Sequence, residues 1–313
     1  MIEPFQLITE YRDYVWGGSR LRPGQRTAEA WVVFEGDRIA DGPFKHQTLA
    51  TAAAELGPEL LGQPVVDKTG LRFPLLVKLL DCADWLSLQV HPNDEQARRL
   101  EGPDHFGKTE AWHVLDADPG SELLFGLQPG TSPADLAKAV RGGSVLDLVQ
   151  HHKVQPGDTV FISPGMIHAL GPGLLIYEVQ QTSNITYRVF DWNRPLTAGR
   201  SLHIDQSLAV LNPKAEARIR PRPPVKDGSR KTLVTCPYFS LDLLCAQTNP
   251  VQLNTRGESF HTLTVIAGRT LVQGSGWSLS LGSYESVVIP AVTGEYWLVP
   301  DGNMMALKSS PIG

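Results

Sequence analysis

Polar side chains recur at every second position in the otherwise apolar segment Trp85–Val90 and its continuation to Asp94. Alternate residues of a strand share a face, so Ser87, Gln89 and His91 would point to one side. Amide and imidazole groups can bind a metal ion or a polar substrate. The same alternation is typical of a strand whose polar side faces solvent, and this segment alone leaves both interpretations open.

A second pair of reactive side chains, Lys108 and Glu110, lies in the segment Phe106–Leu115. The two would share one face of a strand, and a lysine and glutamate at this spacing often form a solvated surface pair. Mostly apolar residues follow from Ala111 onward, however, which indicates that the strand enters a core. A buried carboxylate must be paired or bound to a metal. We therefore expect Glu110 to be buried and partnered.

His168 follows a Pro-Gly turn and precedes two apolar residues on a further predicted strand. Alone, such a histidine would more often be a satisfied core residue. Together, Gln89, His91, Glu110 and His168 form a mixed nitrogen and oxygen set that suits zinc or a similar divalent ion. The set contains no thiolate, which is typical of a reactive site rather than a purely structural one. The other histidines have no comparable partners in the sequence.

Charged and polar residues also mark the segment Leu174–Pro195. Glu178 and Gln180 would share one face of a strand, and alternate residues from Asn184 to Arg188 would share one face of the next strand, if that strand is continuous. The outside of a sheet carries such residues too. An arginine within a strand is well suited to bind a carboxylate or a phosphate, because its guanidinium can donate two parallel hydrogen bonds.

Short β-strands are the elements that must position these side chains. The clearest predicted strands are rich in β-branched and aromatic residues and bounded by Gly or Pro: Asp158–Ser163, Leu174–Val179, Ile185–Phe190, Leu263–Ile266 and Ser286–Ile289. Helical patterns are fewer and lie apart from the strands, at Gln47–Leu61, Asn93–Leu100 and Ser132–Gly143. We predict a mainly β chain, a sandwich or barrel with a few helical insertions.

Domain organisation is indicated by the run Pro221–Lys231, which is rich in proline and polar residues and has no apolar periodicity. We interpret residues 221–231 as a linker. It would separate a first domain of residues 1–220, with the candidate metal ligands and the helical insertions, from a second β domain of residues 232–313.

Two segments with a related pattern lie on either side of this linker, Gln155–Leu170 and Leu281–Leu298. Each has a Gly-bounded turn, an apolar strand that ends in Pro, another Gly and a second strand. This similarity indicates a duplicated β unit. The first copy contains His168, whereas the second has Glu295 and Tyr296 near the equivalent place. We therefore expect only the first domain to bind a metal.

Composition excludes several classes of protein. The 28 Lys and Arg residues against 33 Asp and Glu give a net charge of −5, so nucleic acid and anionic membrane are not expected partners. No stretch approaches the roughly 20 apolar residues of a membrane span. Cys82, Cys236 and Cys245 form no disulfide pattern, and Glu3 and Glu10 interrupt any signal-like start, so we expect a cytoplasmic protein. Phosphate-loop, dinucleotide-binding and serine-hydrolase motifs are absent from the sequence.

Several motifs resemble known families. PGDTVFISPGMIHAL looks like the second metal-binding motif of cupins, which are small β-barrels of the jelly-roll type. In order along the chain, QVHP, GKTEAW, GMIHAL and QQTSNITYRVFDWNRP resemble the type I mannose-6-phosphate isomerases, particularly their short bacterial form. YVWGGSRL and AEAWVVF are similar to the opening motifs of that family. The resemblance covers almost the whole chain.

This resemblance implies two cupin-like jelly-roll barrels with helical insertions and one zinc ion in the first barrel. It implies an aldose–ketose isomerase that interconverts mannose 6-phosphate and fructose 6-phosphate through an enediol. The expected partner is thus a hexose phosphate, and the expected assembly is a monomer or a weak homodimer.

The resemblance also implies roles for single residues. The positions that match the family's zinc ligands are Gln89, His91, Glu110 and His168. Its essential arginine matches Arg188, its active-site lysine matches Lys108, and Ser87 matches a position associated with the substrate phosphate.

Two positions depart from the family pattern. Asn184 stands where many members have an aspartate implicated in proton transfer, and Phe34 replaces a small polar residue. We therefore take Asn184 as a substrate contact and Glu178 as a candidate for the proton shuttle. The missing aspartate keeps open a cupin that binds a sugar or sugar phosphate without catalysis. A metal-dependent oxygenase on the same barrel would instead require iron and consume oxygen.

Overall fold

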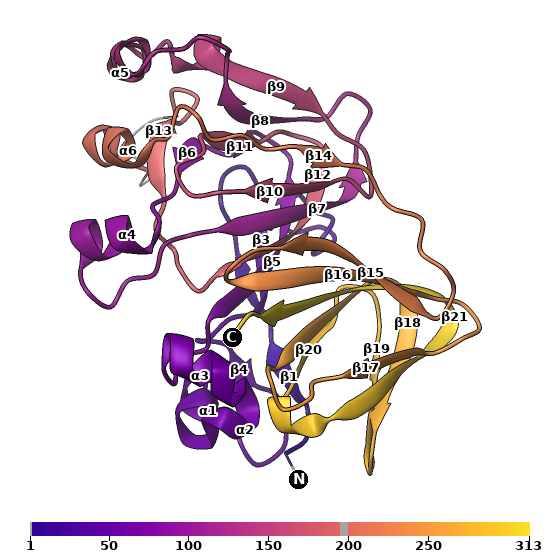
Figure 1. Ribbon diagram of the computed structural model, residues 1–313. Helices are drawn as coiled ribbons and strands as arrows, with labels where there is room; N and C mark the ends of the chain where they lie inside the picture. Colours follow the sequence, from indigo (N-terminus) through magenta and orange to yellow (C-terminus); the bar gives the residue numbers. More distant parts are fainter. Residues whose placement is uncertain (1, 195–199) are drawn as a thin grey trace. The chain divides into compact units, whose positions relative to one another are not determined.

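The computed structural model describes residues 2–194 and 200–313, and β-strands predominate in this part of the chain (Figure 1). Pro195, the last residue of the fourth motif above, lies outside the described residues. The chain divides into two compact units: the first comprises Met1–Glu10, Trp31–Lys78 and Pro223–Gly313, and the second Tyr11–Ala30 and Leu79–Arg222. The prediction of a mainly β chain with few helices is confirmed.

One nine-stranded sheet forms the body of the first unit. Its strand order is β15-β16-β21-β18-β20-β1-β4, with β17 paired to β21 and β19 to β18. Its strands are β1 Phe5–Ile8, β4 Arg38–Ile39, β15 Ser229–Thr235, β16 Phe239–Ala246, β17 Val251–Asn254, β18 His261–Gly274, β19 Trp277–Leu281, β20 Ser286–Ile289 and β21 Glu295–Pro311. Alternate residues of these strands bury one apolar core, which includes Leu244, Val265 and Ala306. Residues 221–228 have no helix or strand, and β15 begins at Ser229.

Three short helices belong to the same unit: α1 Leu49–Leu56, α2 Pro58–Leu61 and α3 Gln63–Thr69, and a 3-10 turn, η3, spans Ala291–Thr293. The hydroxyl of Thr48 accepts the N–H of Thr51 and caps α1. The helical pattern over Gln47–Leu61 is confirmed as two helices rather than one, because Gly57, with a φ of +50°, interrupts the helix before Pro58 starts the next one.

Two further sheets lie mainly in the second unit, although the division between the units falls within β2, β3 and β5. Their orders are β14-β10-β7-β12-β5-β3-β2 and β13-β6-β11-β8-β9, and in the described residues each order has two ends, so these sheets are open. The first contains β2 Glu10–Arg12, β3 Glu29–Val33, β5 Leu75–Cys82, β7 Glu110–Ala117, β10 Thr159–Ile162, β12 Leu174–Gln181 and β14 Ile219–Arg220. The second contains β6 Leu88–Val90, β8 Glu122–Leu127, β9 Val149–Lys153, β11 His168–Leu170 and β13 Tyr187–Phe190.

The helices of this unit are α4 Asp94–Glu101, α5 Pro133–Gly142, α6 Ile204–Val210 and the 3-10 turn η1 Val145–Leu148. Asn93 and Gln96 form a reciprocal capping box at α4, and Ser132 caps α5 before a left-handed Gly143 ends it. Both predicted helices are therefore confirmed. Helix α6 escaped prediction because it has seven residues and no side-chain cap.

A shared core fills the space between the seven-stranded and five-stranded sheets. It joins Trp112 and Ile176 of one sheet to Phe125 and Leu170 of the other. By alternation Glu110 and Glu178 share this inner face with Trp112 and Ile176, and His168 shares it with Leu170. Apolar residues of α5 and α6 pack with the opposite face of the five-stranded sheet. The polar candidates thus project into the interior of a β-sandwich.

Strand β13 begins at Tyr187, so the expectation of a strand over Ile185–Phe190 is only partly right. The carbonyl of Ile185 is bonded by the imidazole of His91 rather than by a neighbouring strand, and that of Ser183 accepts from the Gln180 amide. Asn184 therefore lies in the connection before β13, and a continuous strand face from Asn184 to Arg188 is wrong. No helix in the described residues combines the length and apolar character needed to cross a bilayer.

Candidate metal centre

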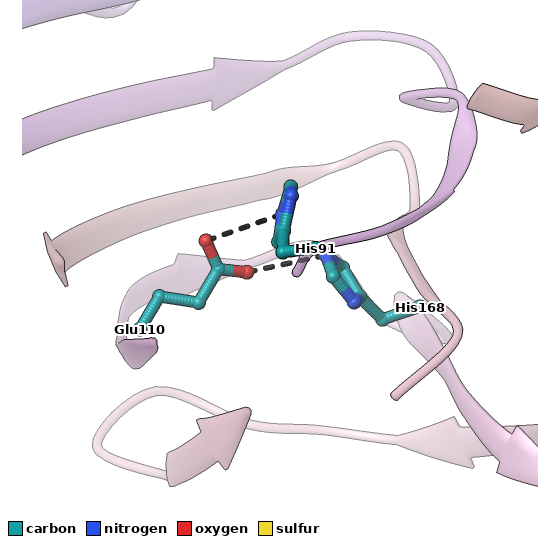
Figure 2. Close-up of side chains that lie close together, drawn as sticks. All are labelled: His91, Glu110 and His168. Carbon is teal, nitrogen blue, oxygen red and sulfur yellow. Dashed lines mark ion pairs between the residues drawn. The ribbon is translucent and has the colours of Figure 1, made fainter. Parts of the chain in front are cut away.

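Three strands bring the proposed ligands together. His91 directly follows β6, Glu110 is the first residue of β7, and His168 is the first residue of β11. Residues Gln89 and His168 lie directly opposite each other in the β6–β11 pair. One ligand atom from each of His91, Glu110 and His168 lies within 4.8 Å of the others, and Figure 2 shows both imidazoles facing the carboxylate.

Backbone carbonyl groups fix the two imidazole rings. The Nδ1 atom of His91 lies 2.8 Å from the carbonyl oxygen of Ile185, and that of His168 lies 2.9 Å from the carbonyl oxygen of Met166. Each Nδ1 must carry the proton in order to donate, which leaves the Nε2 lone pair of each neutral ring for another partner. These Nε2 atoms lie 3.6 and 3.2 Å from the Glu110 carboxylate oxygens. With neutral rings, the Nε2 lone pairs face the carboxylate oxygens, and a cation between them would stabilise this arrangement.

Burial strengthens the case for a bound cation, since the side chains of His91, Glu110 and His168 are at most 1% exposed. Burial, followed by the nearby Lys108 ammonium, holds the pKa of His91 well below its usual range. Burial would raise the pKa of Glu110, but Lys108, His91 and His168 outweigh it and hold that pKa well below its usual range. Neutral imidazole and ionised carboxylate are the states that bind a divalent ion.

Lys108 supplies positive charge at the same point. Its Nζ lies 2.7 Å from a carboxylate oxygen of Glu110 and 3.1 Å from Nε2 of His91. The Lys108 backbone N–H donates to the carbonyl of Pro92, which fixes the chain just before β7. The buried Glu110 is therefore partnered, as expected from the sequence.

Gln89 lies beside this cluster. Its Nε2 atom is 3.3 Å from Nε2 of His168, and its Oε1 lies 3.5 Å from the hydroxyl of Ser87. The oxygen and nitrogen of an amide are exchanged by a half-turn of the group, so Gln89 can present Oε1 to the same point as the imidazoles. The donor set of one amide oxygen, two imidazoles and one carboxylate thus fits a zinc-type ion.

Two arginines and Ser87 lie near Gln89: Arg188 is on β13, Ser87 directly precedes β6, and Arg200 is in a connection. Arg188 is directly opposite Gln89 in the β6–β13 pair, and its Nε is buried with no hydrogen-bond partner in the described residues. Arg200 bonds Asp191 at 2.8 Å and the Ser87 hydroxyl at 3.2 Å. Burial and then the charge of Arg200 lower the pKa of Arg188. Asp191 neutralises part of the Arg200 charge, and the Arg188 guanidinium beside them is a candidate site for an anion.

Arg200 is a candidate that the sequence analysis missed. It follows the segment 195–199, lies more than a hundred residues from Ser87, and belongs to no recognisable spacing pattern. Only the path of the chain brings it to Ser87.

Glu178 and Asn184 occupy different environments. Glu178 is 3% exposed, and its Oε2 accepts the indole N–H of Trp112 at 2.8 Å. The Trp112 ring in turn lies 5.3 Å from the His168 ring, edge to face. Glu178 therefore reaches the cluster through an intervening indole, whereas Asn184 is exposed.

A buried His-Glu-His cluster lies at the interior of a β-sandwich, beside a lysine and two arginines. These features define a β-sandwich protein with a candidate metal centre and an adjoining candidate anion site. Residues 5–113 match the family model of the phosphomannose isomerase type I catalytic domain. Mannose-6-phosphate isomerase of Streptococcus mutans is 36% identical over 255 residues, which are 77% of this chain and 78% of that protein. A probable mannose-6-phosphate isomerase of Bacillus subtilis, GmuF, is 30% identical over 312 residues, 95% of this chain and 96% of that protein. The chain belongs to the type I mannose-6-phosphate isomerase family.

Solved structures show the same architecture. The mannose 6-phosphate isomerase of Bacillus subtilis matches with a TM-score of 0.87 and 29% identity, over 98% of this chain and 99% of that chain. A zinc-bound mannose 6-phosphate isomerase matches with a TM-score of 0.76 and 16% identity, over 98% and 99% of the two chains, which supports the fold. The fold is therefore cupin-like, as the family resemblance implied.

Proposed function

We propose that the protein is a metal-dependent aldose–ketose isomerase that interconverts mannose 6-phosphate and fructose 6-phosphate. The observation that carries this proposal is the convergence of the imidazole Nε2 atoms of His91 and His168 on the buried Glu110 carboxylate, in a chain of this family. The alternative, a protein that binds a sugar without catalysis, was based on the missing aspartate at position 184. Asn184 lies exposed in a connection, outside the His-Glu-His cluster.

A single zinc ion is the proposed cofactor, held by Gln89, His91, Glu110 and His168. Nitrogen and oxygen ligands without thiolate, and without a closed set of four strong donors, suit an ion that keeps a position for substrate. Such an ion supplies Lewis acidity, which polarises sugar oxygens.

Isomerisation moves a proton between C1 and C2 through an enediol, so the chain must stabilise negative charge on an oxygen and hold one proton. Arg188 is the proposed charge stabiliser, because its guanidinium lies beside Gln89 with a buried N–H that has no hydrogen-bond partner in the described residues. Lys108 is the proposed contact to the sugar oxygens near Glu110. Glu178 stays the proposed proton carrier, since an amide such as that of Asn184 takes up no proton.

The substrate phosphate is assigned to Ser87 and the two arginines. The Ser87 hydroxyl already accepts an N–H from Arg200, and Arg188 and Arg200 share one region of positive charge. A guanidinium binds phosphate through two parallel hydrogen bonds, which fixes the end of the sugar that does not react. Asn184, at the exposed connection, is proposed to contact the substrate at the entrance.

Two further assignments concern architecture. We propose two jelly-roll barrels of the cupin type, a catalytic one within residues 1–220 and, after the linker 221–231, one at 232–313 without metal ligands. In support, the metal-type cluster found in the described residues lies entirely within 1–220. Free thiols at Cys82, Cys236 and Cys245 support a cytoplasmic location, and light scattering would test the proposed monomer or weak homodimer.

A coupled assay that follows both directions of the conversion tests substrate, reaction and metal together. We expect turnover with the purified protein, loss of activity after chelation, and recovery on addition of zinc. Mannose 6-phosphate deuterated at C2 should lose deuterium to water, because isomerisation exchanges that position and simple binding does not. Full turnover in a chelated preparation with no metal by elemental analysis would refute the metal assignment.

A further inference from the structure

The core of the first unit is apolar along most of the nine-stranded sheet but polar at one end. Asp242 of β16 lies opposite Lys308 of β21, and Ser240 lies opposite Ser310. By alternation these residues share the inner face with Leu244 and Ala306, which belong to the apolar core. The isomerase site in the second unit uses none of these groups.

A buried ion pair forms the floor of this polar end. Lys308 Nζ lies 3.2 Å from a carboxylate oxygen of Asp242, with both side chains at most 5% exposed, and it donates to the Ser310 hydroxyl at 3.2 Å. The half-exposed Arg230 places a guanidinium nitrogen 3.7 Å from the same carboxylate. Burying charge is costly, and here two cations share one carboxylate, which leaves the floor with a net positive charge.

His261 lies beside this floor on β18. Its ring is 5% exposed, and Nδ1 is 2.7 Å from the hydroxyl of the fully buried Tyr296. That contact is the ring's one hydrogen bond in the described part of the chain, so Nε2 is available to a ligand. Burial, then the charges of Lys308 and Arg230, hold the pKa of His261 well below its usual range.

A cavity of about 720 Å³ opens over these groups and lies within the first unit. Its lining includes Arg230, His261 and Ser310 at the inner end and Gln252, Asn254 and Glu258 farther out. The exposed charges of the rim, Arg256 against Glu258 and Glu295, add one net negative charge. The cavity thus has a basic inner end and a rim of amides and carboxylates, which are acceptors for hydroxyl groups.

We infer that this cavity is a second binding site, for a small phosphorylated sugar or polyol. Its phosphate would lie against Arg230, Ser310 and Nε2 of His261, and its hydroxyls would bond to Gln252, Asn254 and Glu258. The Arg230 guanidinium can bind phosphate through two parallel hydrogen bonds. Lys308 neutralises the Asp242 carboxylate, which leaves the charge of Arg230 available to the phosphate. The duplicated pattern supports this location, because Tyr296, which contacts His261, lies near the place in the second copy that is equivalent to the proposed ligand His168.

Histidine side-chain NMR on the full-length enzyme tests this inference, with the His261 ring signal identified from a His261→Gln variant. The probes are mannitol 6-phosphate, which cannot isomerise, inorganic phosphate and mannitol. We expect mannitol 6-phosphate to shift the His261 signal with a saturable Kd of about 1 mM or tighter, inorganic phosphate to bind more weakly, and mannitol to have no effect. Because His261 reports only the cavity, binding at the catalytic site does not enter the readout.

Arg230→Gln and Lys231→Gln form the matched pair of variants, since each removes one positive charge from neighbouring positions of β15 and alternation directs Lys231 away from the cavity. We expect Arg230→Gln to raise the Kd at least about fivefold, the scale of one lost charge-assisted hydrogen bond, and Lys231→Gln to leave it unchanged. Isomerase activity should be unaffected in both. A linear, non-saturating response, equal effects of the two variants, or equal shifts by mannitol and mannitol 6-phosphate would each overturn the inference.

Discussion

At the level of single residues, the candidate metal centre depends on groups that fix the protonation of its neighbours. The carbonyls of Ile185 and Met166 hold the Nδ1 protons, so both Nε2 atoms present lone pairs to Glu110. Lys108 neutralises part of the carboxylate charge without blocking its second oxygen. Arg188 differs from these groups, because its buried Nε has no hydrogen-bond partner in the described residues and can bond a charge that develops during the reaction.

Replacing Arg188 with alanine should therefore act on the transition state. We expect kcat/KM to fall roughly 100-fold, which corresponds to ~3 kcal/mol, the scale of one lost oxyanion donor. Arg188→Lys should recover part of the loss, because the ammonium keeps the charge but not the planar fork. Steady-state kinetics in the coupled assay measures both, with the exposed Arg218→Ala as the control. An unchanged kcat in Arg188→Ala would show that the residue has no such role.

The types and alternation of these residues made much of the cluster predictable. Gln89, His91 and Glu110 each stand beside apolar runs, where burial demands a partner, and the structure brings His91 and Glu110 together with His168. Arg200 could not be predicted, because its contact with Ser87 depends on how the chain returns after β13. The same holds for His261, whose partner Tyr296 is 35 residues away and carries no metal-ligand pattern.

At the level of elements, the strands that bury both faces were predictable, and the connections were not. Strand β12 has a largely apolar sequence and begins at Leu174, as expected, but continues two residues past Val179, to Gln181. The connection to β13 is irregular because side chains of Gln180 and His91 use its carbonyl groups, and such long-range bonds leave no local pattern. A similar device fixes the chain before β7, where Gly107 donates to Asp94 at the start of α4.

Gly107 allows this close approach, since a Cβ there would lie 2.4 Å from the backbone carbon of Asn93. Gly107→Ala should displace either the start of α4 or the segment that carries Lys108. We expect a loss of roughly 1–3 kcal/mol in the free energy of unfolding, typical of overpacking, together with a lower kcat. Thermal unfolding and the coupled assay would measure the two effects.

Gly142→Ala is the matched control for this variant, because a Cβ at Gly142 meets nothing within 4 Å and the residue ends helix α5. Alanine there should be neutral or stabilise by up to about 1 kcal/mol, with unchanged kcat. If Gly107→Ala behaved like Gly142→Ala, the close approach of the segment before β7 to the start of α4 would not position Lys108.

At the level of the whole molecule, a net charge of −5 would repel an anionic substrate at long range. The described cations near the candidate sites are instead buried or half-buried, where a few suffice to attract an anion: Lys108, Arg188 and Arg200 at one site and Arg230 and Lys308 at the other.

A neutral imidazole is also buried in this protein. His113 lies on β7, on the face opposite to Glu110 of the candidate metal centre. It is 2% exposed, and its Nδ1 lies 2.9 Å from the Thr159 hydroxyl.

Burial, and then the charge of Arg222, lower the pKa of His113 to about 4 from an ordinary value of 6.5. Between these two values His113 binds a proton in the unfolded chain but not in the folded protein, so folding stability falls as the pH drops through this window. Above pH 6.5 both states are neutral, and below about pH 4 both are protonated, so the effect stops at either end. At pH 4.5 this one group should cost roughly 2–3 kcal/mol of unfolding free energy relative to pH 7.5.

Replacing His113 with glutamine should remove this contribution, because an amide can bond Thr159 but does not titrate. We expect the unfolding midpoints of His113→Gln at pH 7.5 and pH 4.5 to lie closer together than those of the unmodified protein, by the amount that His113 contributes. The exposed His105→Gln controls for the loss of a histidine and should leave the difference between the two pH values unchanged. An unaltered pH dependence in His113→Gln would mean that the acid sensitivity of the fold comes from other buried groups, such as the carboxylate of Glu110, whose lowered pKa also makes stability fall as the pH drops.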